Sequence, residues 1–170
     1  MNKDLSAKAI GVLGVEIKKQ GLPSSFLNLA MLQLAHETGG FNSRVSRLNN
    51  LSGIKFSKNG FGYDSGVKPP PNEGNTSYAA YKSLNDWAKD YIRIVRKSGA
   101  QNAKTIQEFA AKLKAARYYG DTVERYTKGL LSWTGQLRDI VGEIPINTTN
   151  TTDTILILII ISSFLIYATS

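Results

Sequence analysis

Glu37 is the residue whose position most clearly suggests chemistry. It follows the largely apolar run 31–35 and stands two residues before Gly39 and Gly40. If the run is helical, the carboxyl lies at the negative end of the helix and beside apolar packing, and we expect both effects to raise its pKa. Such a carboxyl suits general acid catalysis at neutral pH, and the glycines would let a substrate approach closely. The alternative is an ordinary surface glutamate near a helix end.

The composition narrows the other kinds of chemistry. The chain has no Cys and a single His, His36, which excludes a thiol nucleophile and makes a Ser-His-Asp triad depend on His36 alone. His36 is one helical step, about 100°, from Glu37, so we expect a structural or rim position rather than a base. No phosphate-binding loop, Rossmann glycine pattern or zinc spacing is present. We therefore expect neither a metal nor a cofactor.

The charge balance favours a polyanionic partner. The chain carries 21 Lys and Arg against 13 Asp and Glu, a formal net charge of +8. Such a field favours nucleic acid, anionic lipid or an acidic cell-wall polymer. The basic residues are scattered rather than gathered in the stripe typical of nucleic-acid-binding proteins, so we expect no nucleic-acid partner.

The elements that must position Glu37 are mostly helical. Apolar spacing predicts a first helix over residues 5–17, stopped by the Gly-Leu-Pro sequence at 21–23. A second helix begins after Ser24 or Ser25 and ends at Gly39, because glycine tolerates the left-handed conformation. The predicted inner face of this second helix consists of Leu27, Ala30, Met31 and Leu34.

Residues 41–82 interrupt the helical pattern. They are rich in Gly and Pro, and we expect loops with a short hairpin that pairs 54–56 with 78–81. Helices then resume, each opened by a capping-box pattern, at Ser83–Asp86, Thr105–Glu108 and Asp121–Glu124.

Residues 154–170 carry no charge and include the apolar run 155–161. As a helix this segment would reach about 25 Å, slightly short of a hydrocarbon core of roughly 30 Å, and bilayer thinning accommodates such a mismatch. It follows a polar linker, residues 135–153. We expect a transmembrane helix that contacts the lipid bilayer; the alternative is a buried helix or strand of the domain.

Four motifs, in order, resemble those of the bacterial and phage glucosaminidases of the flagellar peptidoglycan-hydrolase type. They are His-Glu-Thr-Gly-Gly-Phe at 36–41, Asn-Asn-Leu-Ser-Gly-Ile-Lys at 49–55, the aromatic stretch 78–91, and Arg-Tyr-Tyr-Gly-Asp-Thr-Val-Glu-Arg-Tyr at 117–126. The resemblance covers roughly residues 5–133. Ser52 stands where the family has Phe, a departure that predicts a looser wall of the cleft.

The resemblance implies a fold and a reaction. The fold is a mostly α, lysozyme-like domain with a small irregular or β lobe, and the reaction is cleavage of the β-1,4 bond after N-acetylglucosamine in peptidoglycan. Glu37 becomes the general acid. The second carboxylate would lie in the lobe, where Glu73 and Asp64 are both candidates and Glu73 is preferred. A third option uses no second carboxylate, since the acetamido group of the substrate can attack instead.

The resemblance also implies substrate-binding residues. Tyr118 and Tyr119 occupy the aromatic position near the acid, where one would contact a sugar and the other the core. Asn50 would either bond sugar hydroxyls or hold its loop. Tyr81, in the aromatic strand, completes the predicted set.

These features predict a membrane-anchored lysin that acts on peptidoglycan glycan strands. The predicted organisation is a glucosaminidase domain over 1–134, the linker 135–153 and a single-pass C-terminal anchor over 154–170. Its setting would be a bacterial envelope or a membrane-containing virion. The alternatives are a muramidase or lytic transglycosylase on the same scaffold, and a non-catalytic wall-binding or virion structural module.

Overall fold

The computed structural model describes residues 1–71 and 74–141 of the chain. Glu73 and the predicted transmembrane segment 154–170 lie outside the described residues. Within the described ranges, no helix is both long enough and apolar enough to span a bilayer.

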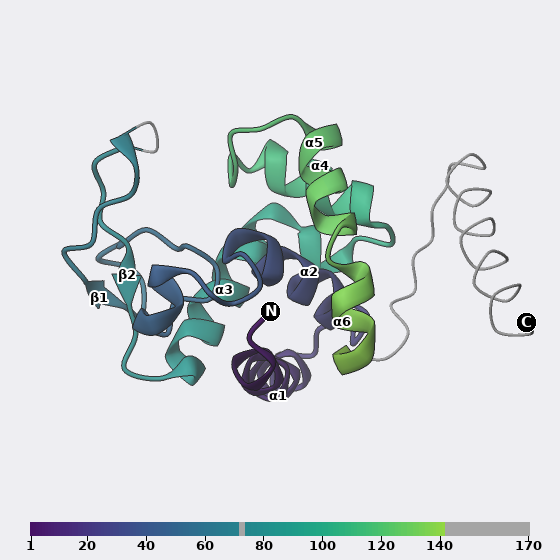
Figure 1. Cartoon of the computed structure of the whole chain (residues 1–170), viewed down its shortest axis with the longest axis horizontal. Helices are drawn as coiled ribbons and strands as arrows, with labels where there is room; N and C mark the ends of the chain where they lie inside the picture. The colour runs from purple at the N-terminus through teal and green to yellow at the C-terminus, as the bar shows by residue number, and fades with distance from the viewer. Residues whose placement is uncertain (72–73, 142–170) are drawn as a thin grey trace, which may run out of the picture.

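The described residues form a mostly helical body with a small lobe beside it (Figure 1). The α-helices are α1 Lys3–Lys19, α2 Phe26–Glu37, α3 Leu84–Ser98, α4 Ile106–Ala115, α5 Val123–Leu131 and α6 Thr134–Val141. Short 3-10 helices occupy η1 Arg44–Leu48 and η3 Ala100–Asn102. In the lobe, β1 Tyr63–Asp64 pairs antiparallel with β2 Ala79–Ala80, with Tyr63 opposite Ala80.

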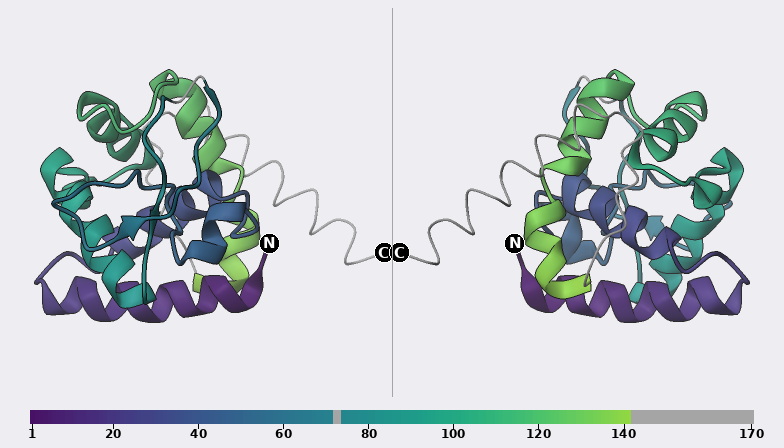
Figure 2. Two further views of the ribbon diagram at one scale, coloured as in Figure 1. Left: turned by 90° about the vertical axis from the view of Figure 1, so that its left-hand side faces the viewer. Right: turned by 90° about the vertical axis from the view of Figure 1, so that its right-hand side faces the viewer.

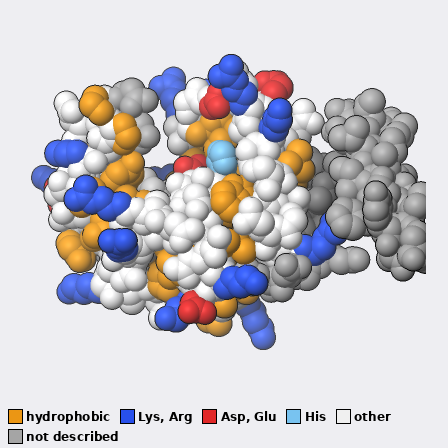
Figure 3. Space-filling view, viewed as in Figure 1, with side chains coloured by type: hydrophobic (Ala, Val, Ile, Leu, Met, Phe, Trp, Pro, Cys, Tyr) orange, Lys and Arg blue, Asp and Glu red, His pale blue; other side chains and the backbone are white. Residues whose placement is uncertain are grey.

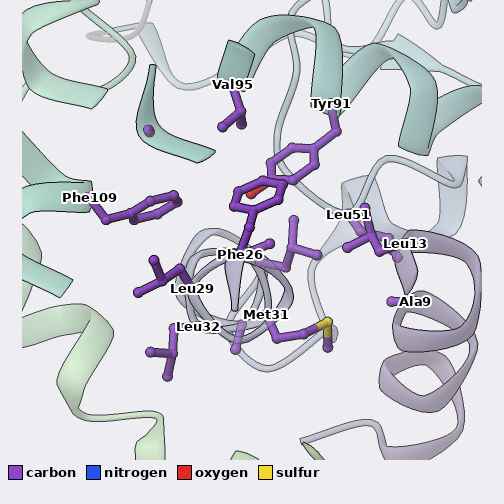
Figure 4. Close-up of a cluster of buried hydrophobic side chains, with 14 of the residues drawn as sticks. Ala9, Leu13, Phe26, Leu29, Met31, Leu32, Leu51, Tyr91, Val95 and Phe109 are labelled. Atoms are coloured by element: carbon purple, nitrogen blue, oxygen red, sulfur yellow. The ribbon is translucent and has the colours of Figure 1, made fainter. Parts of the chain in front are cut away.

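Helix α2 lies at the centre of the body. The predicted inner face was too narrow, because Phe26, Leu29 and Leu32 are also buried whereas Leu27 is only half-buried. A helix that is apolar on all sides is surrounded by other elements, and α1, α5 and α6 all contact α2. Figure 4 shows Phe26 among side chains of the neighbouring elements, and its ring stacks on that of Tyr91 in α3 with 6.3 Å between centroids. The helix that ends in Glu37 is therefore held from several directions.

The end of α2 is defined by its glycines, as predicted. Gly39 and Gly40 have φ angles of 56° and 71°, in the left-handed region that favours glycine. The Gly40 N–H donates to the Ala35 carbonyl at 2.7 Å, which closes the helix. A Cβ atom on Gly40 would lie 2.9 Å from the Trp133 ring, so the close packing here also requires a glycine.

Two of the three predicted helix caps are confirmed and one is displaced. The hydroxyls of Ser83 and Thr105 accept from backbone N–H groups three residues later, as a capping box requires. In the third helix, Thr122 rather than Asp121 caps, and its hydroxyl accepts from the Arg125 N–H. The Asp121 carboxylate instead accepts from the N–H of Thr122.

The hairpin in the lobe is only partly as predicted. The expected pairing exists as backbone bonds from Phe56 N to Ser77 O (2.7 Å) and from Ala79 N to Ile54 O (2.9 Å). The segment around Ala79 also pairs on its other side with β1, which the sequence did not predict. This pairing brings Gly62 so close to β2 that a Cβ atom there would lie 3.0 Å from the Ala80 carbonyl oxygen.

Helix α6 includes residues that the sequence assigned to the linker. Leu137 is fully buried in the hydrophobic core, and α6 contacts both α1 and α2 (Figure 2). Residues 135–141 are therefore helical and packed against the domain, and the remainder of the predicted linker lies outside the described residues.

Candidate active site

A cleft of about 800 Å³ separates the lobe from the turn between α4 and α5. Residues 52–55 line it from the lobe, and residues 117–120 line it from the turn. Glu37, at the end of α2, and Ile94 of α3 complete the lining. Figure 3 shows the surface hollowed between the lobe and the part formed by α4 and α5, with Lys and Arg scattered over this face.

Glu37 is held in the cleft by a tyrosine. The hydroxyl of Tyr126 in α5 donates to Glu37 Oε1 at 2.6 Å. Burial, and next the Glu37 carboxylate, raise the pKa of Tyr126, so this phenol stays protonated and remains a donor. The sequence reasoning placed Tyr126 only on the inner face of its helix, although it is the last residue of the 117–126 motif. The protonation state of Glu37 stays a prediction.

Tyr119 supports Tyr126 from the side of the cleft. Their rings stack with 3.6 Å between centroids and an interplanar angle of 8°. The Tyr119 hydroxyl donates to the Ala110 carbonyl at 2.9 Å, which fixes the ring against α4. Tyr119 therefore positions the partner of Glu37 and also lines the cleft.

Tyr118 joins the two sides of the cleft. Its hydroxyl donates to the Ser52 carbonyl in the lobe at 3.1 Å, and its ring lines the cleft with Glu37. Burial, and after it the Glu37 carboxylate, raise the pKa of Tyr118. The structure thus brings Tyr118 and Tyr119 to Glu37, while their binding of a sugar stays a prediction.

A buried polar pair lies one helical turn before Glu37. The Tyr91 hydroxyl donates to Gln33 Oε1 at 2.6 Å, and both side chains are fully buried. The sequence analysis did not select Gln33, and the signal available was a single polar residue within the otherwise apolar stretch 29–35, four positions before Glu37.

His36 lies outside the cleft lining, consistent with the expected structural position. Its ring meets that of Tyr126 edge-on, with 5.1 Å between centroids. It packs so closely on α5 that a Cβ atom on Gly129 would collide with it. Burial lowers the pKa of His36 and outweighs the opposing effect of Asp121.

Asn50 and Tyr81 do not belong to the cleft lining. Asn50 is fully buried, and its Nδ2 donates to the carbonyls of Ile54 (2.8 Å) and Ala79 (2.9 Å). These two bonds hold the loop, which is one of the two roles expected for Asn50. Tyr81 is 2% exposed and donates to Asp90 Oδ2 at 2.9 Å, which ties the lobe to α3. Contacts of either side chain with a sugar stay predictions.

Of the two candidates for a second carboxylate, the structure describes Asp64 and does not bring it to Glu37. Asp64 is exposed on β1, and its Oδ1 accepts from the Gly66 N–H at 2.9 Å. That bond, followed by one from the Ser77 hydroxyl, lowers the pKa of Asp64. Asp64 does not line the cleft. Glu73 lies outside the described residues.

Ser52 is part of a hydrogen-bonded wall. It is 2% exposed, and its hydroxyl accepts from the Trp87 indole N–H at 3.0 Å. Ser52 stands where the resembling family has Phe, and its hydrogen bond to Trp87 keeps this wall of the cleft connected to α3. Across residues 1–71 and 74–141, no group of three or more His, Asp or Glu could hold a metal ion.

The comparisons with known proteins bear on this site. The family model for glucosaminidase, described as mannosyl-glycoprotein endo-beta-N-acetylglucosaminidase, matches residues 16–139. The chain belongs to the glucosaminidase family. This glucosaminidase is accordingly a glycoside hydrolase, and the matched range contains Glu37 and every described residue of the cleft lining. The search of curated protein sequences returned no match.

Three solved structures share the fold of this glucosaminidase. The C-terminally truncated glycoside hydrolase domain of FlgJ from Salmonella typhimurium is 19% identical, with a TM-score of 0.56 over 82% of this chain and 99% of that one. A chain of a type VI secretion system effector-immunity complex from Pseudomonas protegens is 18% identical, with a TM-score of 0.55 over 80% of this chain and 96% of that one. A peptidoglycan hydrolase from Sphingomonas sp. A1 is 21% identical, with a TM-score of 0.50 over 87% of this chain and 95% of that one. The expected mostly α, lysozyme-like fold with a small β lobe is confirmed for the described residues.

Proposed function

We propose that this glucosaminidase hydrolyses the β-1,4 bond after N-acetylglucosamine in peptidoglycan, with Glu37 as the general acid. The observation that carries the proposal is the position of Glu37 in the cleft, at the end of the central helix and hydrogen-bonded by Tyr126. The family match and the similarity to a structure described as a peptidoglycan hydrolase support it.

We propose a role for each group around the acid. Tyr126 holds Oε1 of Glu37, which restricts rotation of the carboxyl group. Glu37 then transfers its proton to the glycosidic oxygen while the bond from that oxygen to C1 breaks. Positive charge develops on the sugar ring, water finally supplies the hydroxyl group to C1, and the remaining proton of that water passes to a carboxylate of the site. Tyr118 and Tyr119 offer aromatic surface for the sugar beside the acid.

Glu73 is proposed as the second carboxylate, which would activate the water or stabilise the developing charge. Asp64 is the weaker candidate because it is exposed, bonded to Gly66 and absent from the cleft lining. Glu73→Gln and Asp64→Asn, made separately, decide between them. A large loss of activity for Glu73→Gln alone supports the proposal, a large loss for Asp64→Asn alone reverses it, and two mild losses assign the step to the acetamido group of the substrate.

Mass spectrometry of digested peptidoglycan tests the proposed bond. New reducing N-acetylglucosamine ends are expected. Reducing muramic ends would indicate a muramidase, anhydro-muramic ends a lytic transglycosylase, and no products a wall-binding module. Glu37→Gln retains the side-chain volume but not the transferable proton, so activity should fall by at least about 10²-fold while the fold persists. A folded Glu37→Gln protein with near-normal activity would remove Glu37 from the mechanism.

We further propose that residues 154–170 anchor the enzyme in a bilayer, either of a bacterial envelope or of a membrane-containing virion. The support is the uncharged, apolar sequence of this segment. The full chain should float with liposomes and stay bound at high salt, since apolar insertion is not screened. Ile159→Arg should cost about 2.5–3.5 kcal/mol of insertion free energy and release much of the protein. A full chain that stays in solution without detergent would contradict the anchor and leave the hydrolase proposal intact.

A further inference from the structure

Two hydrogen bonds between buried side chains lie next to each other on α2. The Tyr91 hydroxyl of α3 donates to Gln33 Oε1 at 2.6 Å. The Tyr126 hydroxyl of α5 donates to Glu37 Oε1, also at 2.6 Å. Gln33 and Glu37 are four residues apart in the same helix, so their side chains share one face, one turn apart. The acid and the buried amide are therefore neighbours.

The amide of Gln33 has a donor that the core does not use. Gln33 is fully buried, and no described residue accepts a hydrogen bond of ordinary distance and angle from its Nε2 atom. A buried N–H group without an acceptor costs free energy. The bond from Tyr91 requires only an acceptor at this position, so it does not account for the N–H groups of the amide.

Tyr91 fixes the orientation of this amide. Burial, and next the Glu37 carboxylate, raise the pKa of Tyr91 well above its ordinary value, so the phenol keeps its proton and remains a donor. Figure 4 shows the Tyr91 side chain reaching from α3 toward α2. A donor on this side holds Oε1 of Gln33 toward Tyr91 and turns Nε2 away. The reversed amide would leave the buried Tyr91 hydroxyl without its acceptor.

The Gln33 amide acts on Tyr126. Burial and then the Glu37 carboxylate raise the pKa of Tyr126, and the Gln33 side chain opposes them by lowering it. A neighbour has this effect when it offers a donor to the phenol oxygen. Since the proton of this phenol is given to Glu37, its oxygen keeps lone pairs that can accept from Nε2. Gln33 does not line the cleft, so it reaches the acid only through this tyrosine.

We propose that Gln33 is a positioning residue that acts on Glu37 through the hydroxyl of Tyr126. The inference rests on the proposed function, in which Glu37 gives its proton to the glycosidic oxygen and is left as a carboxylate. The new charge strengthens the bond from Tyr126, and the polarised phenol oxygen becomes a better acceptor for Gln33 Nε2. The unused donor of the free enzyme is thus satisfied as charge develops. The chain of bonds therefore stabilises the transition state more than the resting acid.

Two measurements test the proposal: the pH–rate profile of peptidoglycan digestion, and an NMR titration of the Glu37 carboxyl carbon, which needs no substrate. Gln33→Met removes the amide at similar volume. Activity should fall about two- to fivefold, and the pKa of Glu37 should rise in both measurements, because its carboxylate loses support. In the Tyr126→Phe background the same substitution should change neither quantity, since the chain is already broken.

A second variant and a matched control separate this role from stability. Gln33→Met leaves the Tyr91 hydroxyl unpaired, whereas adding Tyr91→Phe removes both partners, which is nearly neutral for stability. The double variant should show the same rise in the pKa of Glu37. Gln101→Met is the control, because Gln101 of η3 lies outside the cleft lining and its buried Oε1 has no described partner. It should leave both measurements unchanged.

The other titratable groups near the acid are the same in parent and variants. They are Lys55, Arg117, Tyr118 and Tyr119 in the cleft lining, His36 against the Tyr126 ring, and the proposed second carboxylate. A difference between parent and Gln33→Met therefore reports the loss of the amide.

The inference is overturned if Gln33→Met lowers Tm but leaves the pH–rate profile and the Glu37 titration unchanged. It is also overturned if the substitution has its full effect in the Tyr126→Phe background, since Gln33 would then act through packing. If the parent digests peptidoglycan in either case, the proposed function stands without the chain of bonds. If the parent cuts no peptidoglycan but the Glu37 titration responds as expected, the proposed function fails and the chain of bonds stands.

Discussion

The helical body and the lobe are stabilised by different forces. In the body, large side chains such as Trp87, Tyr91 and Phe26 are fully buried and stack on one another, so apolar packing dominates. The lobe, residues 41–82, has strands of two residues and leaves Phe61 and Tyr63 55% and 53% exposed. Phe41 and Leu51 join the lobe to the hydrophobic core, and its loops are held by hydrogen bonds from buried polar side chains such as Asn50.

The same contrast divides the active site. Glu37 and Tyr126 belong to the packed body, whereas residues 52–55 on the opposite wall belong to the lobe. The body therefore holds the acid rigidly, and the lobe determines the shape of the cleft through a small number of polar bonds. We expect changes in the body to alter global stability and changes in the lobe to alter activity first.

The largest expected effect comes from the core of the body. Phe26→Ala removes a fully buried ring that stacks on Tyr91, and it should lower the free energy of unfolding by about 3–5 kcal/mol. Phe61→Ala, in the exposed part of the lobe, should change it by no more than about 0.5 kcal/mol. Urea denaturation measures both. Equal losses for the two variants would mean that the lobe is packed like the body.

The next effect concerns the polar bonds of the lobe. Asn50→Asp removes the two N–H donors that bind the carbonyls of Ile54 and Ala79, and the loss of these buried hydrogen bonds should cost about 1–3 kcal/mol of the free energy of unfolding. Amide exchange should accelerate in the lobe and activity should fall, while exchange in α2 changes less.

Asn59→Asp is the matched control, because Asn59 is an exposed residue of the same lobe. It introduces the same chemical change without a buried partner. If exchange in α2 accelerated as much as exchange in the lobe, the two regions would unfold as one unit.

A smaller effect is expected from the contact that orients the acid. Tyr126→Phe retains the ring that stacks on Tyr119 but removes the hydroxyl that donates to Glu37, and activity should fall about tenfold, the value of one hydrogen bond to a charged group. The basic limb of the pH–rate profile should move to higher pH, since the carboxylate loses a donor. Tyr63→Phe, at an exposed position, provides the control. Unchanged activity together with an unchanged profile would restrict Tyr126 to packing.

The smallest effect is a pH dependence of stability in the body. Burial lowers the pKa of His36 below its ordinary value of 6.5, so the unfolded chain binds the proton more readily than the folded one. The contribution of His36 to the free energy of unfolding is therefore fully present above pH 6.5 and is lost as the pH falls below 6.5. The difference in Tm between the parent and His36→Asn should shrink from about pH 7 to about pH 5. A constant difference would mean that His36 titrates normally.

Local rules predicted the helices and the acid. The caps at Ser83 and Thr105, the glycine stop after α2 and the position of Glu37 depend on neighbours within one helical turn, so they can be derived from sequence. The family resemblance added the fold and the reaction type. The predicted role of Asn50 remained open between sugar and loop, because its bonds reach Ala79, far along the chain.

What only the tertiary structure decided involves contacts across the chain. Tyr126 reaches Glu37, Tyr118 reaches Ser52, and Lys55 and Arg117 meet at one cleft although they belong to different elements. No periodic pattern specifies such pairs, because they depend on how separate helices pack around α2. The sequence by itself determined which segments are helical and that Glu37 lies at the end of one of them, since these follow from residue types and short-range spacing. The groups that surround the acid were decided by the packing of the body against the lobe.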